Sequence, residues 1–575
     1  MTASFQQPSG SGSGPGPGAG PWPGIAPAEL RLETHHGAPC LAWAQRPHDL
    51  AALLLDATAR SPQREILVCQ GERLTYAEFV ARVRRLAGLL RDDCGVRQGD
   101  RVALLLVNGL PLAVAVFAVA WLGAVAVPLN TKQKAAELSL CLTDAAPRAL
   151  LLNPDWWAAA ASGVAAAGVE HLVVTRDAAF PVKAATAVGL PPADALVLED
   201  RLAAPDCPVA AAPALVEEHD AALLLYTSGT TGRPKGAVIS HWNLANAVVT
   251  YQRTLDVGTG DRTVIAVPMF HVTGLIAQFL LLTHAGGCSV VLPAFDAGAL
   301  LDALQAERAT FFHAAPTVYL MLLRHAGHAA YRLDAWRTAV AGGSATPAEV
   351  VRELRAWLPQ LRFHTAYGLT ETSSPAVVMP AVPERERRLL SGSCGLPIPV
   401  AECKVVGTGG QELGPGEAGE LLLRGATVAE GYWANPAATR ATFAGGWLRT
   451  GDVARIDAGG WVHLLDRLKD MINRGAEKVY SIEVEDVLHA HPDVVEAAVI
   501  GIPDPLYGET VKAVVVARPG SGLDEAAVRR WVAERLAGYK VPSAVAFLAA
   551  LPRNPNGKVQ KGLLRSNEAR RTEHS

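Results

Sequence analysis

The segment from residue 223 to residue 236 has the composition of a phosphate-binding loop. It reads LLLYTSGTTGRPKG, so an apolar run leads into a loop rich in glycine and hydroxyl groups that carries one lysine. Glycines let backbone N–H groups approach a phosphate chain, hydroxyls donate hydrogen bonds, and the lysine supplies positive charge. Short clusters of this kind are usually surface turns, but fourteen ordered positions favour a nucleotide phosphate. The candidate ligands are Thr227, Ser228, Gly229, Thr230, Thr231, Gly232 and Lys235.

This loop is not the one found in P-loop NTPases. Pro234 precedes the lysine, and Gly236 follows it where that motif has Ser or Thr. A different class of nucleotide-binding enzyme is therefore favoured.

Glu371 is the candidate metal ligand. It ends the string Tyr367-Gly368-Leu-Thr370-Glu371, which follows a short β-like run over 362–366. We expect the Thr-Glu pair to project from the end of a strand, where ligands of α/β sheets gather. One carboxylate together with substrate phosphates suits Mg²⁺. The alternative is the first turn of a helix, where a carboxylate favours the helix dipole.

Gly342, Gly343 and Ser344 end another apolar run. The absence of side chains at the glycines would let a flat base approach closely. The string Thr346-Pro347-Ala-Glu that follows also fits an ordinary helix start, with the threonine as N-cap and the proline at the first helical position. In that interpretation the glycines only permit a turn.

Asp452 and Arg467 lie on either side of a turn expected near residues 458–460. A carboxylate can accept hydrogen bonds from both hydroxyls of a ribose, and an arginine can contact the same diol. The alternative is a surface ion pair, which contributes little to stability.

The elements that would position these residues belong to an α/β protein. Apolar runs alternate with longer helical patterns up to about residue 400, which predicts βαβ units and mostly parallel sheets. Residues 400–465 have Gly/Pro turns between short strands and should be antiparallel, and a small α+β domain follows. The expected strands are 101–107, 124–129, 148–152, 171–174, 222–226, 263–267, 288–292 and 338–341. The expected division is a disordered Gly/Pro-rich tail over 1–45, a large domain over 46–468, a small domain over 469–565 and a tail over 566–575.

Composition excludes several classes of protein. The chain has 575 residues, 50% of them hydrophobic and 19% charged, so it is globular and long enough for at least two domains. A net charge of −3 gives no basic surface for nucleic acid or anionic lipid, which favours small-molecule partners. Eight scattered cysteines predict a reducing, cytoplasmic setting, and Met1–Ala28 lacks the features of an export signal. Residues 102–131 carry no charge, but Gly and Pro divide them into strand, helix and strand rather than a membrane span.

Several strings in order along the chain resemble the class I adenylate-forming enzymes, which include acyl-CoA synthetases, aryl-CoA ligases, luciferases and peptide-synthetase adenylation domains. The resemblance covers roughly residues 50–565. The matching strings are YTSGTTGRPKG at 226–236, PMFH at 268–271, GGS at 342–344, YGLTE at 367–371, TGD at 450–452, DRLKD at 466–470 and PNGK at 555–558.

The resemblance implies an acyl-CoA ligase with ATP, Mg²⁺ and coenzyme A. A fatty or aryl acid would react with ATP to give an acyl-adenylate and pyrophosphate, and the thiol of CoA would then give the thioester and AMP. It also implies a large AMP-binding domain with a distorted β-barrel-like section and a small mobile C-terminal domain. The site roles that it implies are Thr370 near the α-phosphate, Gly342–Ser344 and Tyr367 at adenine, Asp452 and Arg467 at ribose, Lys469 at the hinge, Gly475 at pantetheine and Lys558 as the catalytic cation.

Lys558 lies in the turn-prone string RNPNGK, where a lone lysine is usually only a surface charge. Attack of a carboxylate on the α-phosphate creates a crowded anionic centre, and a positioned ammonium would lower that barrier electrostatically. Rotation at Lys469 could then remove this lysine and bring another face of the small domain to the site.

Two departures from the family pattern bear on the substrates. His271 stands where amino-acid-activating members have an aspartate, and an unpaired ammonium in an apolar pocket would be costly, so free amino acids are disfavoured. His271 is either a gate beside the carboxylate or a core histidine, and the uncharged run 272–282 either lines an acyl pocket or is a buried helix.

Ala476 and Lys478 replace the usual Gly and Asn near the thioester-forming site. A carrier-protein pantetheine as the acceptor therefore stays open as an alternative. A non-catalytic nucleotide-binding relative is a second alternative, but it would need losses at the charged positions, and all of these are present: Lys235, Glu371, Asp452, Arg467 and Lys558. The acid itself and the oligomeric state also stay open.

Overall fold

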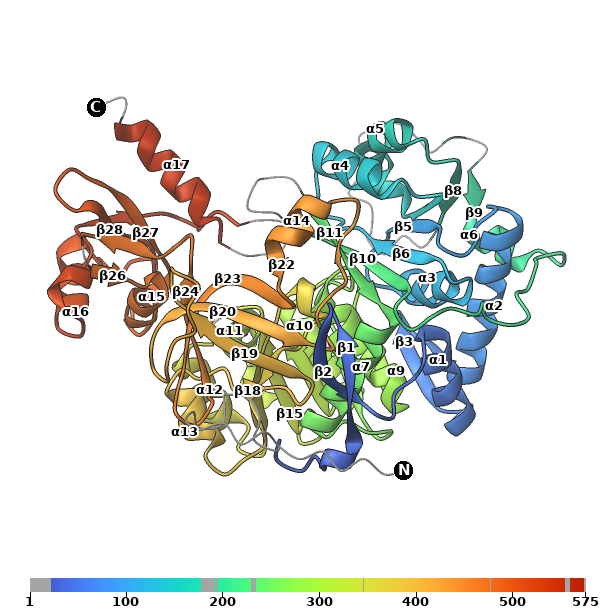
Figure 1. Ribbon diagram of the computed structural model, residues 1–575, viewed down its shortest axis with the longest axis horizontal. Coiled ribbons are helices and arrows are strands. Elements are labelled where there is room, and N and C mark those ends of the chain that lie inside the picture. Colours follow the sequence, from blue (N-terminus) through green and yellow to red (C-terminus); the bar gives the residue numbers. More distant parts are fainter. Residues whose placement is uncertain are drawn as a thin grey trace.

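The computed structural model describes residues 22–176, 192, 195–228, 234–344, 346–475, 477–553 and 559–572. Four larger sheets and one short hairpin make up its strands (Figure 1).

An eight-stranded sheet carries the expected phosphate loop at one of its strand ends. Its order is β21-β11-β10-β6-β5-β7-β8-β9, and the strands from β10 to β9 run parallel. β10 and β11 form an antiparallel hairpin, and β21 pairs with β11. The strands are β5 (Arg101–Leu105), β6 (Val125–Pro128), β7 (Ala149–Leu152), β8 (His171–Val174), β9 (Leu196–Val197), β10 (Ala221–Ser228), β11 (Pro234–Ser240) and β21 (Gly431–Tyr432).

A nine-stranded sheet supplies the second set of strand ends. Its order is β18-β17-β16-β15-β14-β12-β13-β3-β4, with parallel strands from β16 to β3 and antiparallel strands at both edges. The strands are β3 (Glu65–Cys69), β4 (Glu72–Thr75), β12 (Arg262–Ile265), β13 (Cys288–Val291), β14 (Phe311–Ala314), β15 (Thr338–Gly342), β16 (Arg362–Tyr367), β17 (Val377–Val378) and β18 (Leu396–Pro397).

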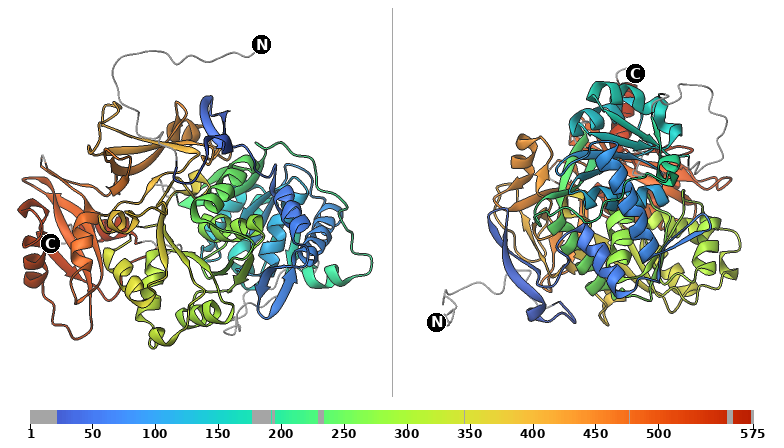
Figure 2. Two further views of the ribbon diagram at one scale, coloured as in Figure 1. Left: turned by 90° about the horizontal axis from the view of Figure 1, so that it is seen from below. Right: turned by 90° about the vertical axis from the view of Figure 1, so that its right-hand side faces the viewer.

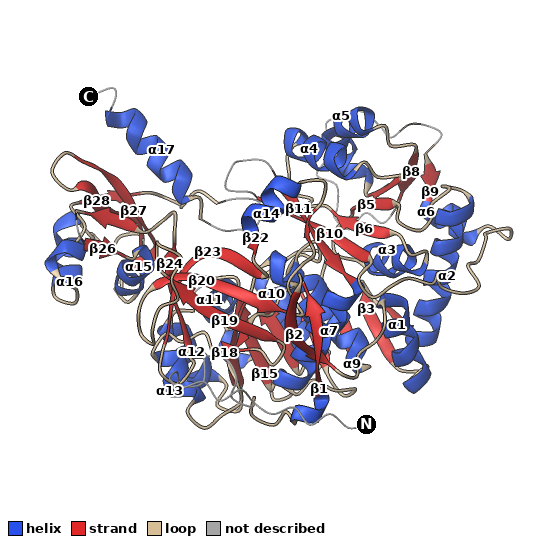
Figure 3. Cartoon of the chain, viewed as in Figure 1, coloured by secondary structure: helices blue, strands red, loops and turns tan. Residues whose placement is uncertain are grey.

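Helices form a layer between these two sheets and cover their outer faces (Figure 3). The inner layer contains α1 (Leu50–Arg60), α2 (Tyr76–Asp92), α3 (Leu110–Trp121), α7 (His241–Leu255) and α9 (Leu281–Ala285). The outer face of the eight-stranded sheet is covered by α4 (Ala135–Ala145) and α5 (Trp157–Ala167). Other helices of the large part are α6 (Leu198–Ala203), α8 (Val272–Gly274), α10 (Ala297–Ala306), α11 (Pro316–Arg324), α12 (Ala348–Trp357), α13 (Arg385–Leu390) and α14 (Pro436–Thr442).

The uncharged stretch after Arg101 folds as β5, α3 and β6, as predicted. Helix α3 has only twelve residues and is buried on nearly all sides, which explains why it lacks charge. Among the described residues, every helix is too short or too polar to cross a membrane.

A hairpin near the N-terminus corrects one expectation. A disordered tail is expected to reach residue 45, but β1 (Leu30–His35) pairs with β2 (Ala38–Trp43). Figure 2 shows this dark blue hairpin beside the antiparallel sheet, and β2 contacts both β20 and α7. The hairpin is short and only its second strand is apolar, so local pattern alone does not reveal it; packing on α7 stabilises it.

The strands of the sheet that spans residues 401–467 are antiparallel, as predicted for residues 400–465. Its five strands are β19 (Ala401–Val406), β20 (Gly419–Gly425), β22 (Phe443–Ala444), β23 (Trp447–Ile456) and β24 (Val462–Arg467). A separate five-stranded sheet follows, with β25 (Ile472–Arg474), β26 (Glu477–Val479), β27 (Val494–Asp504), β28 (Gly508–Ala517) and β29 (Ala544–Phe547). Its helices are α15 (Ser481–His489), α16 (Glu525–Ala533) and α17 (Lys561–Thr572).

Asp466 joins these last two sheets. Its carboxylate accepts hydrogen bonds from the backbone N–H and the hydroxyl of Ser481, the first residue of α15. These two hydrogen bonds hold the start of α15 against β24. Burial raises the pKa of the Asp466 carboxyl, and the nearby Lys561 ammonium opposes the shift.

Candidate active site

The carboxylate of Asp452 is the meeting point of three elements. Tyr367, the last residue of β16, donates its phenol hydrogen to Asp452 Oδ2 over 2.7 Å. Arg467 Nε lies 2.7 Å from the other oxygen, Oδ1, and the two residues are direct partners on the β23–β24 hairpin. Asp452 is only 5% exposed, whereas the Arg467 side chain is 42% exposed. The pair is thus anchored on a buried acid and presents its cation at the surface.

Burial and the Asp452 carboxylate raise the pKa of Tyr367 well above its usual value. The phenol therefore stays protonated at any physiological pH and acts as a hydrogen-bond donor.

Glu371 and Lys235 converge on one aromatic ring. The hydroxyl of Tyr432 donates to Glu371 Oε1 over 2.8 Å, and Lys235 Nζ lies 5.0 Å from the centre of the Tyr432 ring. The contact with Lys235 has cation–π geometry. Burial and the Glu371 carboxylate raise the pKa of Tyr432, so its hydroxyl remains a donor. The expected metal ligand and the expected phosphate ligand thus lie at the same place.

The segment 429–433 ties these residues together through its backbone. Ala429 N donates to the carbonyl oxygen of Glu371 over 2.9 Å, and Glu430 N donates to that of Val238 over 2.9 Å. Trp433 N donates to the carbonyl oxygen of Gly236 over 2.8 Å. The hairpin that carries Lys235 is therefore held directly against the turn that carries Glu371.

Gly368 allows the chain to turn sharply after β16. A Cβ atom at this position would lie 1.5 Å from the carbonyl oxygen of Ser374, so any side chain would displace the backbone. The turn continues into the short 3-10 helix Thr370–Thr372. Ser374 is fixed in turn by Tyr251, whose hydroxyl lies 2.9 Å from Ser374 Oγ. Thr370 and Glu371 thus follow a strand end, as predicted, and Glu371 also lies in the first turn of a short helix, which is the alternative expectation.

The expected adenine segment begins at the neighbouring strand end. Gly342 is the last residue of β15 and pairs with Ala366 of β16. A Cβ atom at Gly342 would lie 2.9 Å from the Ala366 carbonyl oxygen and 3.0 Å from His313 Nε2. Gly343 has a φ of +86°, and Ser344 is exposed. The close approach to Ala366 gives Gly342 a structural role.

The expected start of the next helix is off by one residue. Helix α12 begins at Ala348 with Pro347 as its N-cap, and no side chain caps it. Pro347 has an extended ψ of 135° and so lies outside the helix, which places Thr346 one residue before the N-cap position. The expected capping by Thr346 is therefore wrong.

His271 is the N-cap residue of α8 and stands at the edge of the core. Its ring packs edge-on to that of Phe270, with centroids 4.6 Å apart. The next residues separate into two groups: Val272 and Thr273 are half-buried, whereas 275–282 lie in the main core and include a π-helical turn over Leu275–Leu280. The run 275–282 is thus a buried helix, one of the two expected alternatives.

The remaining predicted residues lie at strand ends and between sheets. Thr227 and Ser228 end β10, where Thr227 pairs with Lys235. Lys469 is exposed between β24 and β25. Gly475 has a φ of +64° and donates its N–H to the Tyr507 carbonyl oxygen over 2.7 Å. Gly229, Thr230, Thr231, Gly232 and Lys558 lie outside the described residues.

The sequence analysis misses two residues that the structure brings to this region. Tyr432 contacts both Glu371 and Lys235, and its only sequence signal is a Gly-Tyr pair after a short strand-like run. His313, on β14, is 2% exposed and lies next to Gly342. Burial lowers the pKa of His313 to about 3, so it is neutral at neutral pH.

Comparison with known proteins is consistent with this arrangement. Residues 54–433 match the family model of the AMP-binding enzyme, and residues 483–558 match that of the AMP-binding enzyme C-terminal domain. The chain is 38% identical over 506 residues to a feruloyl-CoA synthase of Amycolatopsis sp, which covers 88% of this chain and 96% of that protein.

Solved structures agree with the sequence comparison. ATP-bound MatB from Rhodopseudomonas palustris superposes with a TM-score of 0.81 at 33% identity, covering 91% of this chain and 99% of that one. The anthranilate CoA ligase AuaEII in complex with anthranoyl-AMP gives a TM-score of 0.81 at 27% identity, covering 90% and 97%. The chain belongs to the AMP-binding enzyme family, and within it the chain is an acyl-CoA ligase.

Proposed function

We propose that this ligase joins a fatty or aryl carboxylic acid to ATP as an acyl-adenylate and then transfers the acyl group to coenzyme A. The observation that carries the proposal is the convergence of Lys235 and Glu371 on Tyr432. Tyr367, from which the chain turns toward Glu371, is hydrogen-bonded to Asp452 of the Asp452–Arg467 pair. A basic group from one sheet and an acidic group that follows a strand of the other, brought together at Tyr432, suit a triphosphate with its cation. A buried acid with an exposed arginine suits a ribose diol.

Each proposed role follows from chemistry at the atoms described. Lys235 Nζ, as a point charge over the Tyr432 ring, would neutralise terminal phosphate charge. Thr370 would donate to the α-phosphate, and Asp452 would accept from ribose hydroxyls. Gly342, Gly343, Ser344 and Tyr367 would flank adenine. Lys558 would stabilise the charge that develops as the acid oxygen attacks phosphorus and pyrophosphate leaves.

The donor set at Glu371 fits Mg²⁺. One carboxylate oxygen accepts the Tyr432 hydroxyl, which leaves the other for a hard cation that also keeps waters and phosphate oxygens. When bound, the ion would offset phosphate charge. Tyr432 orients Glu371 for that purpose.

We also propose the division of the chain at Lys469. The antiparallel sheet ends at Arg467, and the next sheet begins at Ile472, so the exposed Lys469 lies between two separately paired units. Rotation at this point would exchange Lys558 for the Gly475 loop at the site, so that pantetheine could approach. A cytoplasmic location stays a prediction, supported by eight free cysteines, seven of them buried.

His271 is proposed to act as a gate beside the acid carboxylate. The half-buried Val272 and Thr273 follow it directly, so this end of the helix is the part that a substrate could reach. The name of the feruloyl-CoA synthase relative favours aryl acids among the candidates.

The proposal is tested by pyrophosphate release with a panel of aryl, fatty and dicarboxylic acids, followed by thioester formation with free CoA. We expect release that requires ATP, Mg²⁺ and one class of acid. Lys558→Ala should abolish this release but still convert a supplied acyl-adenylate to the thioester, whereas Lys404→Ala on β19 should leave both steps unchanged. Release without thioester formation would indicate a carrier-protein acceptor, and ATP binding without turnover would contradict the proposal.

A further inference from the structure

Three histidines and one glutamate from three segments meet beside Trp242. His35 and His36 come from the turn of the β1–β2 hairpin, His219 precedes β10, and Glu430 precedes β21. One ligand atom from each of His35, His36 and Glu430 lies within 4.8 Å of the others. His219 Nδ1 lies 3.1 Å from Glu430 Oε1. These groups are outside the proposed ATP site.

The two adjacent imidazoles are held in an orientation suited to metal binding. His35 Nε2 lies 2.7 Å from the Val428 carbonyl oxygen, and His36 Nε2 lies 2.8 Å from that of Ala429. A carbonyl oxygen can only accept, so both Nε2 atoms carry the hydrogen, and the lone pair of each neutral ring is then on Nδ1. Metal-ligating histidines are oriented in this way by backbone carbonyls.

Burial lowers the pKa of His35 to about 4, and the neighbouring Glu430 carboxylate opposes the shift. Its ring is therefore neutral at neutral pH, which is the form that binds metals.

The hairpin turn places a histidine where the backbone favours another residue. His36 has a φ of 49° and Gly37 a φ of 72°, and His35 pairs directly with Ala38 across them. Two-residue turns with two positive φ values favour Asn-Gly. The conformation brings the His36 ring to 4.1 Å from the His35 ring, measured between centroids. A less favourable residue thus brings a second imidazole to the same point.

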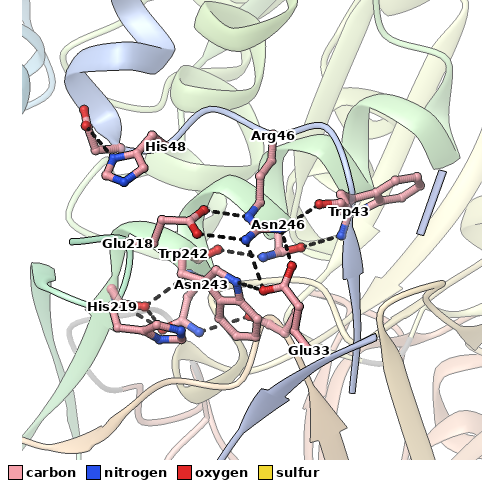
Figure 4. Close-up of polar contacts among 12 residues, drawn as sticks. Glu33, Trp43, Arg46, His48, Glu218, His219, Trp242, Asn243 and Asn246 are labelled. Atoms are coloured by element: carbon pink, nitrogen blue, oxygen red, sulfur yellow. Dashed lines mark hydrogen bonds and ion pairs between the residues drawn. The ribbon is translucent and has the colours of Figure 1, made fainter. Parts of the chain in front are cut away.

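Anchoring of the hairpin does not account for this cluster. Figure 4 shows Arg46 between Glu33 and Glu218, bonded to both, and Trp242 Nε1 donating to Glu33. The Trp43 backbone N–H also donates to Asn246 Oδ1 over 2.9 Å. These contacts already fix β1 and β2 on α7 and use none of the imidazole Nδ1 atoms.

We propose that His35 Nδ1, His36 Nδ1 and the Glu430 carboxylate bind a divalent transition metal of the zinc class, with His219 as the fourth ligand. Imidazole and carboxylate groups suit Zn²⁺, whereas Mg²⁺ and Ca²⁺ prefer all-oxygen sites. Bond lengths of about 2.0–2.1 Å in a tetrahedron place ligand atoms about 3.4 Å apart. The Glu430 and His219 side chains are 26% and 51% exposed, so they have room to move. Such movement can shorten the distances between ligand atoms, which are now up to 4.8 Å among His35, His36 and Glu430, to those of a metal site.

The metal would clamp the hairpin onto the segment that contacts Glu371. The carbonyl oxygen of Ala429 contacts His36, while its N–H donates to Glu371. Ala429 therefore contacts both a proposed zinc ligand and the backbone carbonyl of Glu371, the proposed Mg²⁺ ligand.

The test is direct metal binding by the full chain after treatment with a chelator. ZnCl₂ is titrated against a chromophoric zinc indicator, and Co²⁺ is added separately to record its visible ligand-field spectrum. We expect one tight Zn²⁺ equivalent per chain and a Co²⁺ spectrum of a four-coordinate site. His36→Asn keeps a residue suited to the turn and should weaken Zn²⁺ binding at least 100-fold, as should Glu430→Gln.

His48→Asn is the matched control, because His48 is exposed on the same N-terminal segment and outside the cluster. It should bind Zn²⁺ as the unaltered chain does. Circular dichroism without metal should match for all variants, and Glu430→Gln decides the result should His36→Asn fail to fold. A tight equivalent that persists in both His36→Asn and Glu430→Gln, or no tight equivalent in the unaltered chain, overturns the proposal.

Discussion

The hydroxyl of Tyr432 donates a hydrogen bond to Glu371 Oε1 over 2.8 Å, while the face of the same ring lies 5.0 Å from Lys235 Nζ. One side chain thus positions an acid and a base that are 136 positions apart in the sequence. Its backbone belongs to β21, which pairs with the strand that carries Lys235. Tyr432 is therefore a positioning residue for the proposed phosphate and metal site.

Tyr432→Phe keeps the ring beside Lys235 and removes only the hydrogen bond to Glu371. A hydrogen bond to a charged group contributes about 1.5–3 kcal/mol, so we expect kcat/KM for pyrophosphate release to fall roughly 10- to 150-fold. The concentration of Mg²⁺ needed for half-maximal rate should rise as well, because Glu371 is less well oriented. The measurement is the rate of release over a range of Mg²⁺ concentrations.

The control is Tyr331→Phe, which removes a surface hydrogen bond to Asp302. It should change neither quantity. An unchanged Mg²⁺ dependence in Tyr432→Phe would show that the hydroxyl does not act through Glu371.

Asp452→Asn tests the proposed ribose contact. The amide keeps the shape but loses the charge, so KM for ATP should rise about 10-fold or more. Replacing ATP by its 3′-deoxy analogue should raise KM for the nucleotide by a similar factor in the unaltered enzyme. In Asp452→Asn the rise should be much smaller, because the carboxylate that binds the 3′-hydroxyl is already lost. Kinetics with the two nucleotides and two proteins complete the cycle, with the exposed Asp334→Asn as control. Equal losses in both proteins would exclude a contact between Asp452 and that hydroxyl.

Gly368→Ala should remove activity through the backbone. The added Cβ would lie 1.5 Å from the Ser374 carbonyl oxygen, so the turn that carries Thr370 and Glu371 must shift. A displacement of about 1 Å at a catalytic group can cost about 100-fold in rate, and we expect at least that loss in kcat. Gly258→Ala, which would meet no atom within 4 Å, is the matched control. Normal kcat in Gly368→Ala would mean that the turn is not needed for catalysis.

Buried neutral histidines make stability fall in acid. Burial lowers the pKa of His313 to about 3 and that of His364 to about 4. In the unfolded chain these rings take up protons near pH 6.5, while the folded chain does not until the pH falls much further. The free energy of unfolding therefore decreases below about pH 6.5, by up to about 1.4 kcal/mol per pH unit for each histidine.

His313→Gln should reduce the slope of the free energy of unfolding against pH by the contribution of one proton. Urea unfolding between about pH 6.5 and pH 5 measures the slope for both proteins. An unchanged slope in the variant would show that His313 is protonated in the folded state.

Much of the fold follows from local pattern. The eight expected strands match β5, β6, β7, β8, β10, β12, β13 and β15 because buried parallel strands are continuous apolar runs. Strand ends then bring Tyr367, Gly342 and Thr227 to sheet edges, which is why their neighbourhood could be predicted. The pair Asp452–Arg467 follows from a hairpin with a recognisable glycine turn.

What the sequence does not predict depends on contacts between distant segments. The β1–β2 hairpin is held by α7, Tyr432 acquires its partners by sheet pairing, and His313 acquires its neutral state from the packing around it. The start of α12 was misplaced because Pro347 stays extended, which the string TPAE does not reveal. For the hairpin, Tyr432 and His313, a neighbour in space that is absent from the local sequence decides the outcome, whereas for α12 the backbone conformation of Pro347 decides it.

Asp466 and Arg467 are consecutive on β24, yet they face different units of the chain. Arg467 pairs with Asp452, while Asp466 binds the first residue of α15. A nucleotide that contacts Arg467 thus contacts the same strand end that binds α15 of the C-terminal unit. Coupling of this kind is reciprocal. If ATP binding favours one placement of the C-terminal sheet, then that placement must tighten ATP binding by the same factor.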